Sequence, residues 1–232
     1  MREIVLDTET TGFEPSEGHR IVEIGAVELL NHMPTGKTYH QYINPERDMP
    51  VDAFNVHGIS EEFLADKPKF AAVGQEFLDF IGLDAKLVIH NAAFDMKFLN
   101  FELQKAGLAK IPNDRAVDTL MIARRKFPGS PASLDALCRR FNIDNSSRTL
   151  HGALLDSEIL AEVYLELIGG RQPDFGLSNA PAQKKTAMQI DTAWRPTPRP
   201  TPLPSRLTEE ERSAHGDLVA KMGEAAIWLK YS

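Results

Sequence analysis

Apolar positions along the chain change their spacing near residue 70. Before it, three stretches are rich in β-branched and other apolar residues, at 3–9, 20–30 and 38–44, with polar segments between them. Such runs, bounded by turn residues, are typical of strands. Consecutive strands with short connections usually pair in antiparallel fashion. We therefore expect the chain to begin with an antiparallel meander of three strands.

After residue 70 the apolar side chains recur at helical spacing. They repeat every three to four residues and stop at Gly82, which predicts a helix over 70–81. The same reasoning predicts helices at 92–107, 133–142 and 151–170, and short strands at 86–90 and 115–120. A meander followed by alternating strands and helices makes a mixed β-sheet flanked by helices, so the predicted fold class is α/β.

The composition changes again in the last sixty residues. Proline stands at every second position from 196 to 204, which removes backbone donors and favours an extended linker. Thr208 followed by Glu211 is a capping-box pattern that predicts the start of a helix. We therefore divide the chain into a domain over 1–170, a flexible linker over 171–206 and a C-terminal helix over 207–232.

Bulk composition is ordinary for a soluble globular protein, with 42% apolar and 25% charged residues in 232. No stretch approaches the roughly 20 apolar residues that a membrane span needs, and the sequence begins with a strand pattern rather than a signal peptide. The one cysteine, Cys138, excludes an internal disulfide, and its helical spacing predicts a core position. These features favour a reducing, cytoplasmic location.

Charge is unevenly distributed. The net charge of the chain is −7. Residues 170–232 carry 9 Lys+Arg and 7 Asp+Glu, so residues 1–169 carry 17 Lys+Arg and 26 Asp+Glu. An acidic domain does not attract a polyanion through bulk electrostatics. A nucleic-acid substrate would therefore be held by local contacts, by metal ions or with the help of a partner.

Acidic residues near the ends of predicted elements are the candidate chemistry. Asp7 and Glu9 stand two positions apart on a strand and project to the same side, where like charges repel unless a cation lies between them or solvent screens them. Asp95 and Asp156 each fall in the first turns of a helix, and His151 precedes Asp156 by five residues. The helix dipole accounts for one such acid, but not for four acids and a histidine on elements that can converge.

Three segments carry a resemblance to a known family. "DTETTG" at 7–12, "HNAAFD" at 90–95 and "HGALLD" at 151–156 resemble the motifs of the DEDDh exonucleases, which have a ribonuclease-H-like fold. The histidine five residues before the last aspartate distinguishes this branch from the tyrosine-bearing one. "VHGIS" at 56–60 and "SLDALCRRF" at 133–141 extend the resemblance to the proofreading exonucleases of bacterial replicative polymerases.

The resemblance implies 3′→5′ removal of nucleotides from a DNA end with two divalent ions, Mg²⁺ or Mn²⁺, which prefer oxygen ligands. It implies that Asp7 bridges both ions, that Glu9 and Asp156 complete the site of the ion that activates water, and that Asp95 holds the second ion. His151 is the implied general base, because an ordinary histidine pKa of about 6.5 suits proton removal near neutrality.

Substrate contacts are implied at five further positions: Thr10, Thr11, Gly12, His57 and Asn91. The alternative is that these are ordinary turn residues and, for Asn91, a helix-start residue. Phe54 and Phe63 have the chemistry to stack on terminal bases, but we expect both in the core.

Partner-binding segments are implied in the tail. Gln172, Phe175 and Leu177 in "QPDFGL" resemble the peptide that docks on the bacterial sliding clamp, although an ordinary linker is the alternative. Trp228 and Leu229 lie in a segment that resembles the polymerase-binding helix of the family. Tethering to the catalytic subunit of a replicative DNA polymerase would place the nuclease at high effective concentration near the single-stranded 3′ end of DNA.

Two other functions fit part of the sequence. A stand-alone nuclease of the same family, acting on RNA ends or oligonucleotides, would have the same motifs but no need for the linker and final helix. A non-catalytic adaptor between clamp and polymerase would have no need for the intact acids and His151.

Overall fold

The computed structural model describes residues 1–146, 150–169 and 207–223. The chain divides into two units, Met1–Leu177 and Ser178–Ser232, and each is described by itself. Within the described ranges no helix is both long and apolar enough to cross a membrane. The predicted linker 171–206 lies outside the described residues. The predicted partner-binding residues there and further on also lie outside them: Gln172, Phe175, Leu177, Trp228 and Leu229.

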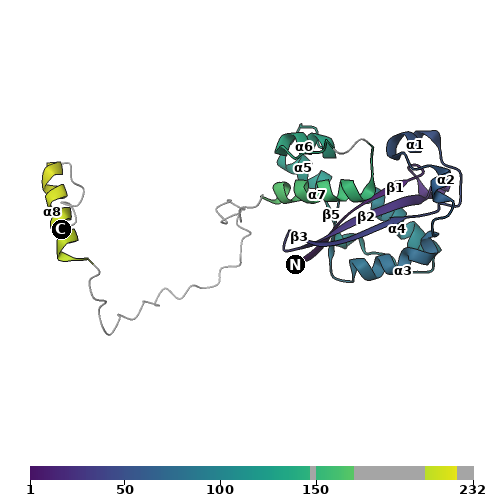
Figure 1. Ribbon diagram of the computed structural model, residues 1–232, viewed down its shortest axis with the longest axis horizontal. Helices are drawn as coiled ribbons and strands as arrows, with labels where there is room; N and C mark the ends of the chain where they lie inside the picture. The colour runs from purple at the N-terminus through teal and green to yellow at the C-terminus, as the bar shows by residue number, and fades with distance from the viewer. Residues whose placement is uncertain (147–149, 170–206, 224–232) are drawn as a thin grey trace, which may run out of the picture. The chain divides into compact units, whose positions relative to one another are not determined.

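A mixed sheet of five strands forms the centre of the first unit, in the order β3-β2-β1-β4-β5 (Figure 1). The predicted meander is present, because β1 (Arg2–Thr10) pairs antiparallel with β2 (Ile21–Leu30), and β2 pairs antiparallel with β3 (Met33–Tyr42). On the other side of β1, β4 (Lys86–Ile89) and β5 (Ala116–Asp118) run parallel to it. The predicted α/β class is therefore confirmed.

Helices cover both faces of this sheet. Those of the first unit are α1 (Val51–His57), α2 (Glu61–Leu64), α3 (Phe70–Ile81), α4 (Ala92–Lys105), α5 (Thr119–Lys126), α6 (Leu134–Phe141) and α7 (Ala153–Ile168). Helices α3 and α4 pack on one face, and α7 packs on the other, with α5 and α6 against its outer side (Figure 1). The sheet is therefore the middle of a three-layer core.

Alternation along β1 decides which helix each of its side chains meets. Ile4 and Leu6 belong to the cluster with α3 and α4, whereas Val5 packs with residues of α7. Because strand side chains alternate, Asp7 and Glu9 have the orientation of Val5, toward α7, and Thr8 faces α4. One strand end thus presents carboxylates to one helix and a hydroxyl to another.

Several predicted helix ends are confirmed. Gly82 ends α3, and the Ser133 hydroxyl accepts from the Ala136 N–H at the start of α6. In the second unit, α8 (Glu209–Met222) begins with the predicted capping box of Thr208 and Glu211. Cys138 is fully buried, as its spacing predicts.

The strand predicted at 115–120 is too long. Only Ala116–Asp118 is extended, because the Asp118 carboxylate accepts hydrogen bonds from the Leu120 and Met121 N–H groups and so starts α5. Apolar spacing does not predict helices α1, α2 and α5, since segments of four to eight residues hold too few turns for a clear period.

The core positions expected for Phe54 and Phe63 are wrong. Their side chains are 41% and 44% exposed, because the short helices that carry them lie at the surface. Phe63 packs its ring edge against Tyr42, with ring centroids 4.9 Å apart, and Lys67 lies over its face.

Candidate functional site

A cavity of about 300 Å³ opens where β1 and β4 end at their carboxyl termini, the usual place for ligands in a sheet of this kind. Its lining comes from four segments of the chain: Asp7, Thr8 and Glu9; His90, Asn91, Phe94 and Asp95; Ser133, Leu134 and Asp135; His151 and Asp156. The five residues predicted to carry the chemistry therefore share one cavity, although up to 149 positions separate them in sequence.

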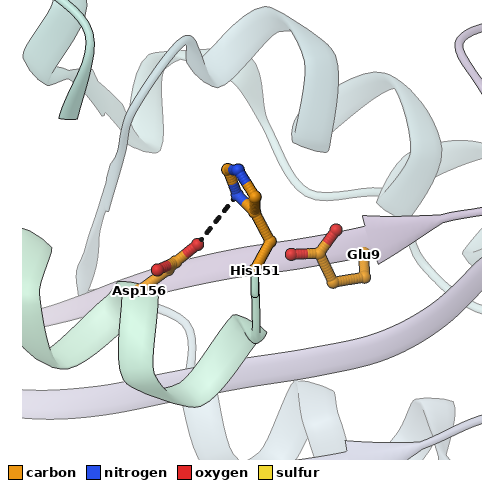
Figure 2. A group of neighbouring side chains, drawn as sticks. All are labelled: Glu9, His151 and Asp156. Atoms are coloured by element: carbon orange, nitrogen blue, oxygen red, sulfur yellow. Dashed lines mark ion pairs between the residues drawn. The ribbon is translucent and has the colours of Figure 1, made fainter. Parts of the chain in front are cut away.

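The tightest group in the cavity is Glu9, His151 and Asp156. One ligand atom from each lies within 4.8 Å of the others. Figure 2 shows Glu9 on β1, Asp156 in the first turn of α7 and His151 on the segment that enters that helix, with their polar ends in one space. The His151 Nδ1 lies 3.3 Å from Oδ2 of Asp156, which orients the imidazole. Both carboxylates are buried, and His151 is about half exposed.

Asp95 reaches the cavity from the opposite layer. It lies in the first turn of α4, and its Oδ1 accepts a hydrogen bond of 2.7 Å from the Thr8 hydroxyl. Burial raises the pKa of Asp95 to about 7, against the hydrogen bond from Thr8, which lowers it. In the absence of a cation, the least costly way to neutralise this buried carboxylate is therefore a proton.

Asp95→Asn is expected to raise the melting temperature at pH 8 in EDTA and to raise it clearly less at pH 5, where only part of the cost of ionisation is present. The raised pKa means that Asp95 costs stability as pH rises from about 4 to about 7, by an amount on the order of a few kcal/mol. Asparagine keeps the acceptor for Thr8 and removes the charge. Thermal unfolding of both proteins at the two pH values checks this, and an equal or lower melting temperature for the variant at pH 8 would contradict it.

Gly25 allows the start of α7 to lie directly on the sheet. It pairs with Asp7 across β1 and β2, and a Cβ there would lie 2.1 Å from the Leu154 nitrogen and 2.2 Å from the Ala153 carbonyl carbon. The Ser157 hydroxyl donates to the Gly25 carbonyl over 2.9 Å. This close approach brings the first turn of α7, and with it Asp156, over the end of β1.

Glu23 replaces the missing N-cap side chain of α7. Gly152 occupies the cap position, and the Ala153 N–H donates instead to Oε2 of Glu23 over 3.1 Å. Oε1 of Glu23 lies 2.7 Å from the Nε2 of His40. A buried carboxylate from β2 thus fixes the segment that carries His151 and Asp156.

Sequence reasoning missed Thr8, Glu23, Gly25 and Asp135 as site residues. An isolated glycine in a strand pattern is a sign of close backbone approach, and an acid within the apolar run "IVEIGAV" is a sign of a buried partner. These two signals could have found Gly25 and Glu23. Thr8 and Asp135 carry no comparable signal.

Asn91 lines the cavity with its backbone in the left-handed region. It stands at the N-cap position of α4 with φ 65° and ψ 53°, and its side chain makes no capping hydrogen bond. Asparagine adopts left-handed backbone more readily than most residues other than glycine. The N-cap position agrees with the alternative of a helix-start residue, so a substrate contact by Asn91 stays a prediction.

A second cavity of about 420 Å³ adjoins the first. It contains the other four residues predicted to contact substrate, namely Thr10, Thr11, Gly12 and His57, and it shares Thr8, Glu9 and Phe94 with the first cavity. His57 is buried, which lowers its pKa, and its Nδ1 accepts from the Ile59 N–H. The roles of these residues remain predictions.

The donor set fits divalent cations. Five carboxylates line this cavity, from Asp7, Glu9, Asp95, Asp135 and Asp156, and hard cations of this class prefer such oxygen ligands. Bringing these negative charges together is costly unless cations compensate them. The site thus has the chemistry of a divalent-metal centre.

The sequence model of a family described as "Exonuclease" matches residues 4–164. Among curated proteins, the DNA polymerase III subunit epsilon of Rickettsia felis is 60% identical over 178 residues, 75% of this chain and 77% of the relative. The protein of that name from Escherichia coli K12 is 47% identical over 238 aligned positions, covering 98% of this chain and 97% of the relative.

Solved structures share the fold. Exonuclease X in complex with 5′ overhanging duplex DNA is 26% identical with a TM-score of 0.56, over 71% of this chain and 90% of that one. The nuclease domain of 3′hExo, a DEDDh family member bound to rAMP, is 22% identical with a TM-score of 0.62, over 72% and 91% of the two chains. The predicted ribonuclease-H-like architecture agrees with both.

Proposed function

Because this chain belongs to the exonuclease family, and within it to the epsilon subunits of DNA polymerase III, we propose that it removes nucleotides from the 3′ end of DNA and proofreads the product of that polymerase. The observation that carries the proposal is the convergence of four acids and a histidine, from segments far apart in sequence, on one cavity. The expected products are nucleoside 5′-monophosphates.

Asp7, Glu9, Asp95 and Asp156 are the residues that would hold the cations, and we propose Mg²⁺ or Mn²⁺. Bound there, two divalent ions supply positive charge at the scissile phosphate and lower the cost of generating hydroxide. Asp7 and Glu9 reach the centre from β1, Asp156 from α7 and Asp95 from α4. The ligands would thus come from three elements of the fold, β1, α4 and α7.

His151 is the proposed general base. Its contact with Asp156 through Nδ1 leaves Nε2 as the nitrogen that takes the proton from the attacking water. The phosphorus–oxygen bond to the departing 3′-oxygen then breaks, this oxygen takes up a proton from solvent to give a 3′-hydroxyl, and the terminal nucleotide leaves with the new phosphate oxygen. The half-exposed position of His151 lets the proton pass on to solvent.

The terminal nucleotide is proposed to occupy the second cavity, beside Thr10, Thr11, Gly12 and His57, with Asn91 at the border of the first. The two cavities share Thr8, Glu9 and Phe94. A nucleotide that fills the second cavity therefore places its phosphate at the carboxylates.

A primer with a 3′-terminal mismatch tests the proposed function. The purified full-length chain is expected to release the mismatched nucleotide with Mg²⁺, to stop in EDTA and to resume when Mg²⁺ or Mn²⁺ is added. An RNA oligonucleotide of the same sequence serves as the comparison substrate. Faster cleavage of RNA would favour the stand-alone ribonuclease, and no cleavage of either would favour the non-catalytic adaptor.

His151→Ala is expected to lower turnover by about 10²- to 10⁴-fold, the usual contribution of a general base. Binding of Mn²⁺ should persist, because the four carboxylates remain. The pH–rate profile of the variant should lose the limb that the histidine contributes. An unchanged profile would contradict the assignment.

We propose the replicative polymerase and the sliding clamp as partners. The polymerase follows from the epsilon relatives, and the segment 207–232 is the proposed contact. The proposed clamp contact is the peptide with Gln172, Phe175 and Leu177, on the basis of its six-residue resemblance to a clamp-docking segment. Deletion of 205–232 should abolish association with the polymerase catalytic subunit. A cytoplasmic location agrees with a replication role.

A further inference from the structure

A buried ion pair lies outside both cavities. The guanidinium of Arg20 donates through Nε to Oε1 of Glu102 over 2.5 Å and through Nη2 to Oε2 over 2.7 Å. The two side chains are 10% and 1% exposed. A buried pair of this kind loses much of its attraction to desolvation and is weak evidence of stabilisation by itself. Its bidentate geometry, however, fixes two elements relative to each other.

The backbone of Arg20 holds the turn that follows β1. The Thr11 N–H donates to the Arg20 carbonyl over 2.9 Å, and the Arg20 N–H donates to the Thr11 hydroxyl over 3.0 Å. The Arg20 side chain also reaches the Pro45 carbonyl beyond β3. The placement of Arg20 therefore sets the placement of the turn Thr10–Gly12, which lines the second cavity.

The other partner, Glu102, is on the helix that carries Asp95. Seven residues separate them, which is two helical turns, so both carboxylates project from the same face of α4. Asp95 is hydrogen-bonded to Thr8 of β1, and Glu102 is paired with Arg20. Two buried contacts along one helix face thus hold α4 to the end of β1 and to the turn that follows it.

We propose that Arg20 and Glu102 are positioning residues that hold the turn Thr10–Gly12 in register with Asp95, so that the terminal nucleotide and the catalytic carboxylates stay aligned. This inference rests on the proposed function. Neither residue lines either of the two cavities, so the pair acts on the substrate only through the turn and the helix. Its loss should therefore raise KM for the 3′ end more than it lowers kcat, since Asp7, Glu9 and His151 keep their places.

The test compares a single and a double variant of the full-length chain. Arg20→Met leaves the Glu102 charge buried without its partner and should lower the melting temperature. Arg20→Met with Glu102→Leu replaces the pair by apolar side chains of similar size and should recover the melting temperature. In both variants KM for a single-stranded oligonucleotide should rise about tenfold, the scale of a small misplacement of a bound group. Arg20→Lys, with one donor group instead of a planar fork, should give an intermediate KM.

Arg2 supplies the matched control. It forms a more exposed, single-contact pair with Glu28, with 2.6 Å between Nε and Oε1, and donates to the Phe80 and Ile81 carbonyls at the other end of β1. Arg2→Met should lower the melting temperature and leave KM unchanged. The control thus separates a general loss of stability from a loss of alignment.

A wild-type KM in Arg20→Met would overturn the inference, and so would recovery of KM together with stability in the double variant. If Arg20→Met does not fold, the KM of the double variant tests the inference by itself: a raised KM supports it and a wild-type KM contradicts it. Failure of the proposed function is a different result, because the wild-type chain itself would then release no nucleotide.

Discussion

Asp7→Ala is expected to abolish nuclease activity, by about 10³-fold or more, while the chain stays folded and its melting temperature stays equal or rises. The family resemblance implies that Asp7 contacts both cations. Its side chain is on the face of β1 that packs against α7, the helix that carries Asp156. Loss of a preorganised charge contact at a phosphate centre removes transition-state stabilisation that no neighbouring residue replaces. Its removal also lowers the repulsion among the carboxylates of the cavity in the absence of cations.

The measurement is release of nucleotides from a 3′-labelled primer, together with thermal unfolding in EDTA. Asp66→Ala is the matched control, because Asp66 is an exposed acid that lines neither cavity. Full activity in purified Asp7→Ala would refute the site assignment, whatever its stability.

Gly25→Ala is expected to be the most damaging single-methyl change in the domain. The added Cβ would meet backbone atoms of α7, with 2.1 Å to the Leu154 nitrogen and 2.4 Å to the Ala153 oxygen. Backbone cannot rotate away as a side chain can, so the start of the helix must move off the sheet. Overpacking in a core costs typically about 1–3 kcal/mol, and here the displaced turn also carries Asp156.

Activity and thermal unfolding of Gly25→Ala should therefore fall together. Gly216→Ala provides the comparison, since Gly216 lies within α8 and a methyl group added there would meet only open space within 4 Å among the described residues. Alanine also favours a helix. A Gly25→Ala protein with wild-type activity and melting temperature would show that α7 does not depend on this close approach.

The sequence predicts those helices and strands whose apolar residues recur at a regular spacing. Helix α3 and the meander can be predicted from apolar spacing. Buried residues recur over several turns of the helix and along several residues of each strand. Helices α1 and α2 are too short to establish a period, so the apolar character of Phe54 and Phe63 alone predicts a core position for them. Their exposure depends on what packs above them, which no local pattern records.

The site residues also fall into those that the sequence predicts and those that it does not. The four acids and His151, expected from the three motifs that carry the family resemblance, do line one cavity, and their roles stay predictions. Glu23 and Gly25 act through the start of α7, about 130 residues further along the chain. The sequence signals that both residues have close neighbours, but only the tertiary arrangement determines that these neighbours belong to α7. The hydrogen bond from Thr8 to Asp95 is of the same kind, since only the orientation of β1 determines which helix Thr8 meets.

Side chains of β1 alternate between the helices on the two faces of the sheet, so the site is complete only when both helix layers have packed. The carboxylates come from an N-terminal strand and from helices near residues 95 and 156, which pack on opposite faces of the sheet. A chain with only one helix layer packed on the sheet would therefore not bring these carboxylates together. In a denaturant titration, nuclease activity should therefore be lost at the same denaturant concentration as the helical circular dichroism signal. Hydrolysis then reports whether both helix layers are packed on the sheet.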